Sequence, residues 1–180
     1  AIEKGRIMDF SRVRFSDFEL DPPLPELRET QLELEEFVEK MRIDDVNNVA
    51  GVDVSYGGDG VVGSYVEMEP SEVSVVYRQT ISRDEVNFPY IPGYLAFREL
   101  PILHELLDSV RKERTLADVL FVDGNGLLHP RGAGLATHLG ITENLTTIGV
   151  AKKLLCGVVS TEGMVEGERR DVVADGEKIG

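Results

Sequence analysis

Apolar residues recur with helical spacing in two stretches of the chain. Between residues 24 and 41 they follow one another at intervals of three, four and seven, and Glu and Lys occupy the opposite face. This pattern predicts an amphipathic helix. Residues 94–110 show similar spacing, and Pro101 within them predicts a restart or a kink. Residues 1–20 show no clear period.

Three short β-like runs lie between the two helical stretches. Residues 49–56, 61–68 and 73–81 are rich in Val and Tyr and are joined by short links that contain Gly or Pro. Such links between β-rich runs are typical of hairpins, so the pattern predicts an antiparallel meander. Residues 87–92 contain two prolines and predict a loop.

The second half of the chain changes character. Residues 119–122 and 147–150 are continuous apolar runs, as expected of strands buried on both faces. A helical run at 133–139 lies between them, which predicts a parallel strand–helix–strand unit. We therefore expect an α/β fold, in which a mixed sheet begins as an antiparallel meander and continues with parallel strands, with helices on both faces.

Composition narrows the class of protein. A length of 180 residues favours a single domain. No apolar signal region or membrane span is evident, and the one cysteine, Cys156, excludes an intrachain disulfide. We expect a cytoplasmic monomer without a membrane partner. The net charge of −14 argues against broad, non-specific nucleic-acid binding, although local basic groups can still line a groove.

Three carboxylates are the main candidates for chemistry. Asp53 lies within an apolar strand, Asp123 ends another, and Glu99 lies near the start of the second helix. Taken singly, each has a structural alternative: a side chain in water, a loop cap, or a surface glutamate near a helix N-terminus. They converge only if the strands at 49–56 and 119–122 are neighbours. A buried acidic cluster would need a counter-charge, and hard oxygen ligands favour a divalent metal.

The glycine loop that begins at Asp123 allows a second interpretation. It follows a strand, precedes a helix, and has Glu143 about twenty residues further on, which partly matches a dinucleotide-binding fingerprint. His129 occupies the third glycine position, Pro130 interrupts the helix start, and Asp123 would repel phosphates. These departures disfavour a nucleotide-binding oxidoreductase.

Three further residues have both a functional and a structural interpretation. Lys152 follows a buried strand, where it could reach a phosphate or an anionic transition state, or lie on the surface. Tyr90 stands on a stiff loop between two prolines, where it could pack or wedge into a base stack. His129 could serve a site or be a structural histidine with both nitrogens satisfied.

Four runs then carry a resemblance to a known family. GVDVSY at 51–56, PYIPGYLAFRE at 89–99, DGNGLLHPRGAGLATH at 123–138 and TIGVAKKLL at 147–155 resemble, in the same order, the signature blocks of the endonuclease V family. The resemblance extends from Val49 to Gly157 and implies an RNase H-like fold over a single domain, residues 1–180. It also implies a further metal-site residue on a C-terminal helix beyond Gly180.

The resemblance also implies roles for individual residues. Asp53, Glu99 and Asp123 match the metal-binding carboxylates, Lys152 matches a lysine near the cleaved phosphate, and Tyr90 matches an aromatic wedge. The positions around the pocket for the extruded base are matched by Gly93, Leu95, Gly124, His129, Gly134, Leu135 and Leu155.

The implied activity is DNA repair by Mg²⁺-dependent cleavage, with Mn²⁺ as a substitute. The family cuts the second phosphodiester 3′ to deoxyinosine and leaves a 3′-hydroxyl and a 5′-phosphate. Two alternatives stay open: an endoribonuclease acting on inosine-containing RNA, and a catalytically silent protein that binds lesions. The partner expected in each case is nucleic acid that contains a deaminated base.

Overall fold

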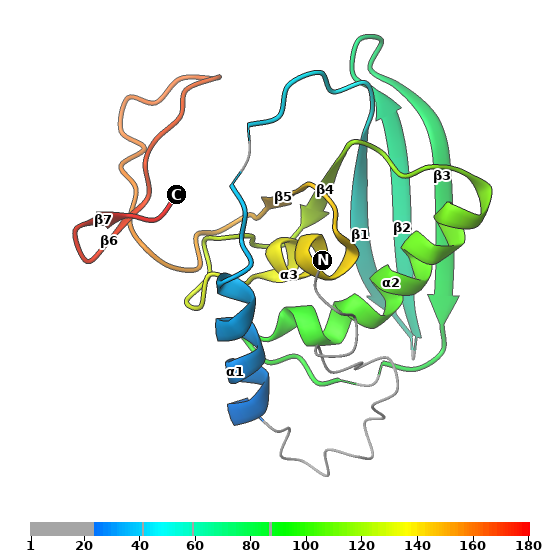
Figure 1. Ribbon diagram of the computed structural model, residues 1–180, viewed down its shortest axis with the longest axis horizontal. Helices are drawn as coiled ribbons and strands as arrows, with labels where there is room; N and C mark the ends of the chain where they lie inside the picture. Colours follow the sequence, from blue (N-terminus) through cyan, green and yellow to red (C-terminus); the bar gives the residue numbers. More distant parts are fainter. Residues whose placement is uncertain (1–23, 41, 59, 87) are drawn as a thin grey trace.

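A five-stranded mixed sheet forms the frame of the molecule. In this computed structural model, residues 24–40, 42–58, 60–86 and 88–180 are described. The aperiodic segment 1–20 and Met41 lie outside the described residues. The strands run in the order β3-β2-β1-β4-β5, as Figure 1 shows. Their bounds are β1 Val49–Gly57, β2 Gly60–Glu69, β3 Ser74–Arg83, β4 Val119–Asp123 and β5 Thr147–Val150.

The strand directions confirm the mixed sheet expected from the sequence. β1, β2 and β3 form the antiparallel meander, whereas β4 pairs in parallel with both β1 and β5. Helix α3, Leu135–Glu143, connects β4 to β5 and completes the strand–helix–strand unit. The central strand is therefore β1, with an antiparallel neighbour on one side and a parallel neighbour on the other.

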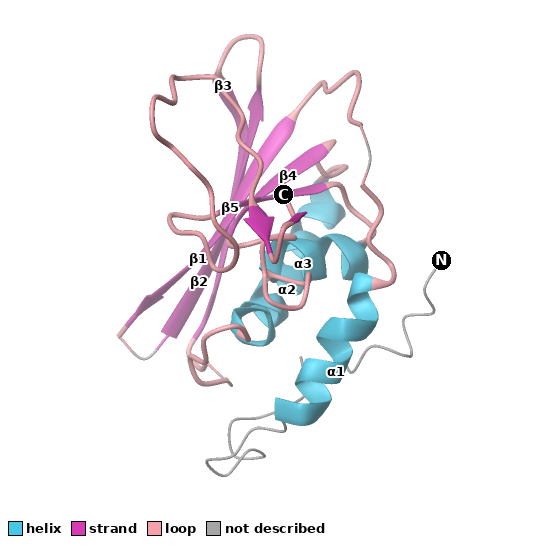
Figure 2. Ribbon diagram, turned by 90° about the vertical axis from the view of Figure 1, so that its left-hand side faces the viewer, coloured by secondary structure: helices cyan, strands magenta, loops and turns pink. Residues whose placement is uncertain are grey.

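The three described helices lie on one face of the sheet. Helix α2, Leu95–Glu113, and α3 share a single core with inward residues of β1, β2 and β4. Helix α1, Leu24–Glu35, packs beside them through a smaller cluster of Leu27, Phe88 and Phe97. Figure 2 shows the sheet nearly edge-on, with the helices on one side.

The opposite face of the sheet is partly open among the described residues. Val62, Val66, Phe121 and Ile148 point to this face and are each 37–38% exposed. The sequence led us to expect helices on both faces, because the β4 and β5 runs are continuously apolar. The expectation that both strands are buried on both faces is wrong for the described residues: Phe121 of β4 is exposed, and Ile148, Gly149 and Val150 of the edge strand β5 are all exposed.

Two helices differ from their expected bounds. Helix α1 ends at Glu35 and not near residue 41, because Phe37 no longer faces the core and is 50% exposed. Helix α2 is continuous through Pro101 and does not restart there. Nine buried side chains along α2 anchor it to the sheet, which outweighs the cost of a proline in the helix interior.

The C-terminal part of the chain forms a small hairpin. Strands β6, Val173–Ala174, and β7, Glu177–Lys178, pair antiparallel around Asp175 and Gly176. Both turn residues have positive φ, 51° and 84°, as expected of an Asp-Gly hairpin turn. None of the helices in the described ranges is long and apolar enough to cross a membrane.

The buried carboxylate of Glu67 is the centre of a hydrogen-bond network at the end of the sheet where β1 begins. Glu67 is fully buried and accepts hydrogen bonds from Asn48 Nδ2 at 2.7 Å, the Tyr65 hydroxyl at 3.2 Å and Arg114 Nη2 at 2.9 Å. The Tyr65 hydroxyl in turn accepts the backbone N–H of Ala117 at 3.1 Å. This network joins β1, β2 and the end of α2.

Replacing Arg114 with alanine tests how much this network contributes. We expect the free energy of unfolding to fall by about 2 kcal/mol, because Glu67 would be left as a buried charge without its cation. Urea unfolding would measure the change. Arg42→Ala is the control, since Arg42 pairs with Asp44 in full exposure and should contribute less than about 0.5 kcal/mol. Equal effects of the two substitutions would contradict this view of Glu67.

Candidate active site

The parallel pairing of β1 with β4 places two of the candidate carboxylates side by side. Val49 to Val52 are opposite Val119 to Val122 in register. The next residue on each strand is Asp53 or Asp123, so both carboxylates lie at the same level on neighbouring strands. The condition for the carboxylates to converge, that β1 and β4 are neighbours, is therefore met. Both side chains are exposed, which corrects the expectation of a fully buried acidic cluster.

Glu99 reaches the same place from α2. It lies in the second turn of the helix and is only 6% exposed, so the alternative of a surface glutamate is wrong. The Tyr56 hydroxyl, near the end of β1, donates a hydrogen bond to its Oε1 at 3.3 Å.

The surroundings of Glu99 disfavour its ionised form. Burial raises the pKa of Glu99 to about 7, and the negative charges of Asp53 and Asp123 add to the rise. The hydrogen bond from Tyr56 and the charge of Arg98 act in the opposite direction. The three carboxylates therefore lie close enough to act on one another, and a cation between them would relieve the repulsion.

The donor atoms suit a hard divalent cation. All three groups offer carboxylate oxygens, the ligands that Mg²⁺ and Mn²⁺ prefer. In the ranges that the structure describes, no three Asp, Glu, His or Cys side chains already converge as a metal site. Asp53, Glu99 and Asp123 thus have the donor chemistry that a divalent metal requires, and the charges of both aspartates reach Glu99.

Lys152 lies at the same end of the sheet. Val150 ends β5 beside Asp123, and its carbonyl accepts the Gly124 N–H at 2.8 Å. Lys152 follows two residues later and is exposed. The lysine is thus close along the chain to the carboxylate edge, and its role near a phosphate stays a prediction.

The glycine loop packs backbone against backbone. A Cβ on Gly134 would lie 2.2 Å from the Asn125 carbonyl oxygen, and one on Gly124 would lie 3.0 Å from the Leu135 side chain. At Gly134 only glycine permits this approach, whereas at Gly124 the Leu135 side chain would have to shift by a few tenths of an ångström. Three of the expected pocket residues, Gly124, Gly134 and Leu135, are thereby brought together directly after Asp123.

The carbonyl oxygen of Gly93 joins the proline loop to this glycine loop. It accepts hydrogen bonds from Arg131 Nη2 at 2.6 Å, His129 Nε2 at 3.0 Å and Gln31 Nε2 at 3.2 Å. Gln31 also donates to the Ala133 carbonyl at 3.2 Å and accepts from Arg131 Nε at 2.7 Å. Helix α1 thereby fastens both loops. We call this set of contacts the Gly93 clamp.

His129 is a structural part of the Gly93 clamp. Its Nδ1 accepts the Arg131 N–H at 3.2 Å, which leaves Nε2 to donate to Gly93. Burial lowers the pKa of His129, so the imidazole stays neutral. The alternative of a satisfied structural histidine is favoured. The sequence analysis missed Gln31 and Arg131, although the burial of Gln31 follows the helical spacing of Leu27 and Leu34.

The other candidate residues differ in exposure. Tyr90 is 69% exposed at the tip of the proline loop, and Leu155 is 43% exposed. Leu95 is half-buried at the first position of α2. Their roles around an extruded base stay predictions, and the exposure of Tyr90 leaves its ring available to a partner.

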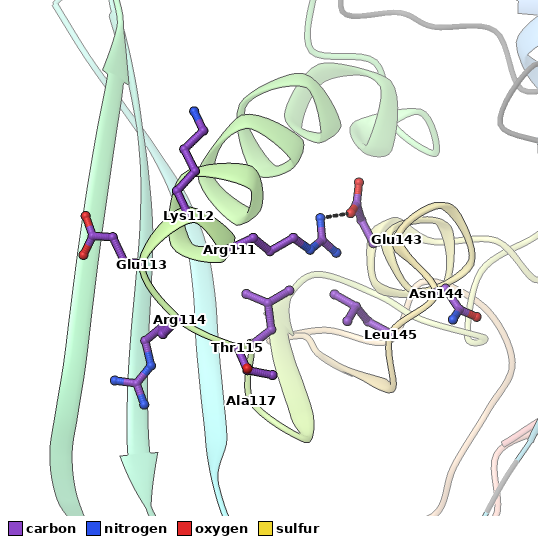
Figure 3. Close-up of a pocket in the computed structure, with 10 residues that line it drawn as sticks. Arg111, Lys112, Glu113, Arg114, Thr115, Ala117, Glu143, Asn144 and Leu145 are labelled. Atoms are coloured by element: carbon purple, nitrogen blue, oxygen red, sulfur yellow. Dashed lines mark hydrogen bonds and ion pairs between the residues drawn. The ribbon is translucent and has the colours of Figure 1, made fainter.

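Glu143 does not have the role that a dinucleotide site requires. Its side chain is 8% exposed, contacts the His104 ring and forms an ion pair with Arg111. Figure 3 shows the Arg111–Glu143 pair in a hollow of about 620 Å³ between the C-terminal ends of α2 and α3. This hollow is at the far end of α2 from Glu99. The carboxylate that would bind a ribose is thus already neutralised.

Comparison with known proteins agrees with the geometry. The family model described as Endonuclease V matches residues 29–180. An endonuclease V from Trichormus variabilis is 39% identical over 142 residues, which cover 75% of this chain and 60% of that protein. A bifunctional methyltransferase/endonuclease from Thermoplasma volcanium is 37% identical over 168 residues, covering 92% of this chain and 49% of its own length. The chain thus spans about half to three fifths of these relatives.

Solved structures show the same fold. An endonuclease V from Streptomyces avermitilis superposes with a TM-score of 0.76 at 34% identity, over 86% of this chain and 68% of that one. An endonuclease V from Ciona intestinalis, solved with DNA containing an inosine followed by a ribo-adenosine, gives a TM-score of 0.69 at 32% identity, over 75% and 59%. The neighbours support the RNase H-like mixed sheet.

The raised pKa of Glu99 predicts a pH-dependent stability of the metal-free protein. The folded protein keeps the Glu99 proton up to about pH 7, whereas the ordinary pKa is 4.5. Unfolding should therefore become easier as the pH rises from 4.5 to 7. Urea unfolding in EDTA would measure this, and Glu99→Gln should flatten the dependence. The control Glu105→Gln, on the exposed part of the same helix, should retain it. Identical pH profiles for the native protein and Glu99→Gln would contradict the assignment.

Proposed function

Because this chain belongs to the endonuclease V family, we propose that it is a metal-dependent endonuclease acting on DNA that contains deoxyinosine. The observation that carries the proposal is the approach of Asp53, Glu99 and Asp123 from two neighbouring strands and a helix. We propose Mg²⁺ as the cation and the second phosphodiester 3′ to hypoxanthine as the cleaved bond, with a 3′-hydroxyl and a 5′-phosphate as the ends.

The three carboxylates would hold the cation, and each side chain contributes differently. Bound Mg²⁺ supplies an activated water and neutralises charge at the phosphorus. Asp53 and Asp123 are exposed and therefore open to solvent and substrate. Glu99 is buried, so its ionised form depends on a nearby positive charge. Lys152 would stabilise negative charge on the phosphate from the neighbouring strand end.

Recognition of the base would fall to the two loops that the Gly93 clamp joins. Hypoxanthine differs from adenine by an oxo group and a ring N–H. We expect the glycine loop to line the pocket for that base, since the close packing and backbone hydrogen bonds of Gly124 and Gly134 fix the path of the loop directly beside Asp123. Tyr90 is exposed at the loop tip, where an aromatic ring can fill the place of an extruded base.

A ribonucleotide substrate is the second candidate. The Ciona intestinalis structures hold DNA in which a ribo-adenosine follows the inosine. The same carboxylate chemistry would cleave inosine-containing RNA. Competition between matched DNA and RNA oligonucleotides would separate the two substrates, since the preferred one should inhibit cleavage of the other at lower concentration.

The proposal predicts that Asp123→Asn abolishes cleavage. Loss of a metal ligand should lower the cleavage rate by at least about a hundredfold. Mutation of a residue that only orients a metal ligand already lowers metal affinity or activity by about tenfold to a hundredfold. End-labelled duplex DNA with one deoxyinosine, incubated with and without Mg²⁺, would report both rate and position. Asp108→Asn removes an exposed carboxylate from α2 and should cleave normally.

Three results of this assay would count against the proposal. Cleavage by Asp123→Asn at the native rate would contradict the assignment of the carboxylates. Cleavage by the native protein without any divalent cation would contradict the metal. Mg²⁺-independent, inosine-specific binding without any cleavage would instead support a silent lesion-binding protein.

Tyr90→Ala should weaken binding to inosine-containing DNA by about tenfold, because base–aromatic stacking contributes about 1–3 kcal/mol per base. Fluorescence anisotropy in EDTA would measure the affinity without cleavage. Tyr90→Phe keeps the aromatic face and should bind as the native protein does. An unchanged affinity in Tyr90→Ala would exclude a wedge role.

A further inference from the structure

Arg98 lies between the proline loop and the carboxylates. Its Nη1 donates a hydrogen bond to the carbonyl oxygen of Phe88, two residues before Tyr90. Its guanidinium carbon lies 4.3 Å from the centroid of the Tyr56 ring. Arg98 also directly precedes Glu99 in α2. Arg98 therefore contacts both the proline loop, which carries Tyr90, and Tyr56 near the end of β1, the strand that contains Asp53.

Tyr56 continues this connection to the buried carboxylate. Its ring lies beneath the Arg98 guanidinium, and its hydroxyl donates to Glu99 Oε1 at 3.3 Å. A hydrogen bond to one carboxylate oxygen restricts rotation of the group and leaves the second oxygen for another ligand. The orientation of Glu99 thus depends on where the Tyr56 ring is held.

We propose that Tyr56 and Arg98 act as a positioning pair that couples the proline loop to the Glu99 carboxylate. Through this pair, the loop that would contact an extruded base and the carboxylate that would bind the cation are held in one arrangement. The inference rests on the proposed function, because it takes Glu99 to be a cation ligand. Neither residue needs to touch the substrate or the metal.

The chemistry of the two side chains suits this role. The planar guanidinium stacks on the Tyr56 ring while one of its N–H groups donates to the Phe88 carbonyl. A lysine cannot hold both contacts in a fixed geometry. The positive charge of Arg98 also favours the ionised form of Glu99. Displacing the guanidinium would therefore disturb the loop and the carboxylate together.

The same arrangement of side chains recurs elsewhere in the sheet and provides a control. Tyr77 lies with its ring 4.9 Å from the Arg114 guanidinium carbon, and its hydroxyl donates to Glu113 at 2.9 Å. This set is at the opposite end of α2, away from Asp53 and Asp123. Tyr77→Phe removes an equivalent hydroxyl without touching the carboxylates of the site.

The first test is Tyr56→Phe, which keeps the ring beneath Arg98 and removes only the hydroxyl. We expect Mn²⁺ affinity of the DNA-free protein, measured by electron paramagnetic resonance of free Mn²⁺, to fall about tenfold. Affinity for inosine-containing DNA in EDTA should stay unchanged. Cleavage should show a lower kcat at limiting Mg²⁺, an unchanged KM for DNA, and recovery at high Mg²⁺. Tyr77→Phe should match the native protein in every measurement.

The second test is Arg98→Lys, which retains the charge. Here both the Mn²⁺ affinity and the metal-free affinity for inosine-containing DNA should fall, each by about threefold or more. An Mn²⁺ affinity of Tyr56→Phe within twofold of the native value would overturn the inference, as would an Arg98→Lys protein that loses only one affinity. Absence of Mn²⁺ binding by the native protein would instead refute the proposed function on which the inference rests.

Discussion

The parallel pairing of β1 with β4 is the constraint on which the rest of the site depends. Its register sets Asp53 and Asp123 at one level on neighbouring strands. Helix α2 packs on the inner face and delivers Glu99 to the end of the same strands. A shift of β4 by one residue would turn Asp123 to the other face and separate the two aspartates. Burial raises the pKa of Glu99, and the negative charges that this pairing concentrates add to the rise.

A second constraint gives the site its walls. The Gly93 carbonyl collects donors from two segments that are far apart in the sequence, Gln31 on helix α1 and His129 with Arg131 on the glycine loop. Because these side chains are themselves largely buried and bonded to one another, the proline loop and the glycine loop cannot move independently. The fold thus combines a rigid frame around the loops with an electrostatically unfavourable cluster beside them. Such local conflict is typical of functional sites, where stability is exchanged for binding.

Much of the fold could be predicted from the pattern of apolar residues, because the hairpins and the parallel unit follow from local turns and buried runs. The pairing of β1 with β4 joins segments that are far apart in the chain. The sequence showed only that the carboxylates converge if these two strands are neighbours, and not that they are. The burial of Glu99 could not be predicted either, since its position near a helix start is equally typical of a surface residue. Gln31 was missed because the sequence alone does not show that a polar residue at a core position of a helix is buried and hydrogen-bonded; this becomes evident only when its partners are known. His129 was left open between two interpretations, and the hydrogen bonds of both nitrogens favour the structural one.

The central claim is that Asp53, Glu99 and Asp123 together hold a divalent cation. Crystals of the protein soaked in Mn²⁺, measured at a wavelength where manganese scatters anomalously, would test it most directly. The account predicts an anomalous peak within bonding distance of oxygens from all three carboxylates, and loss of that peak in Glu99→Gln. A peak bound elsewhere, or no peak at these residues at saturating Mn²⁺, would contradict it.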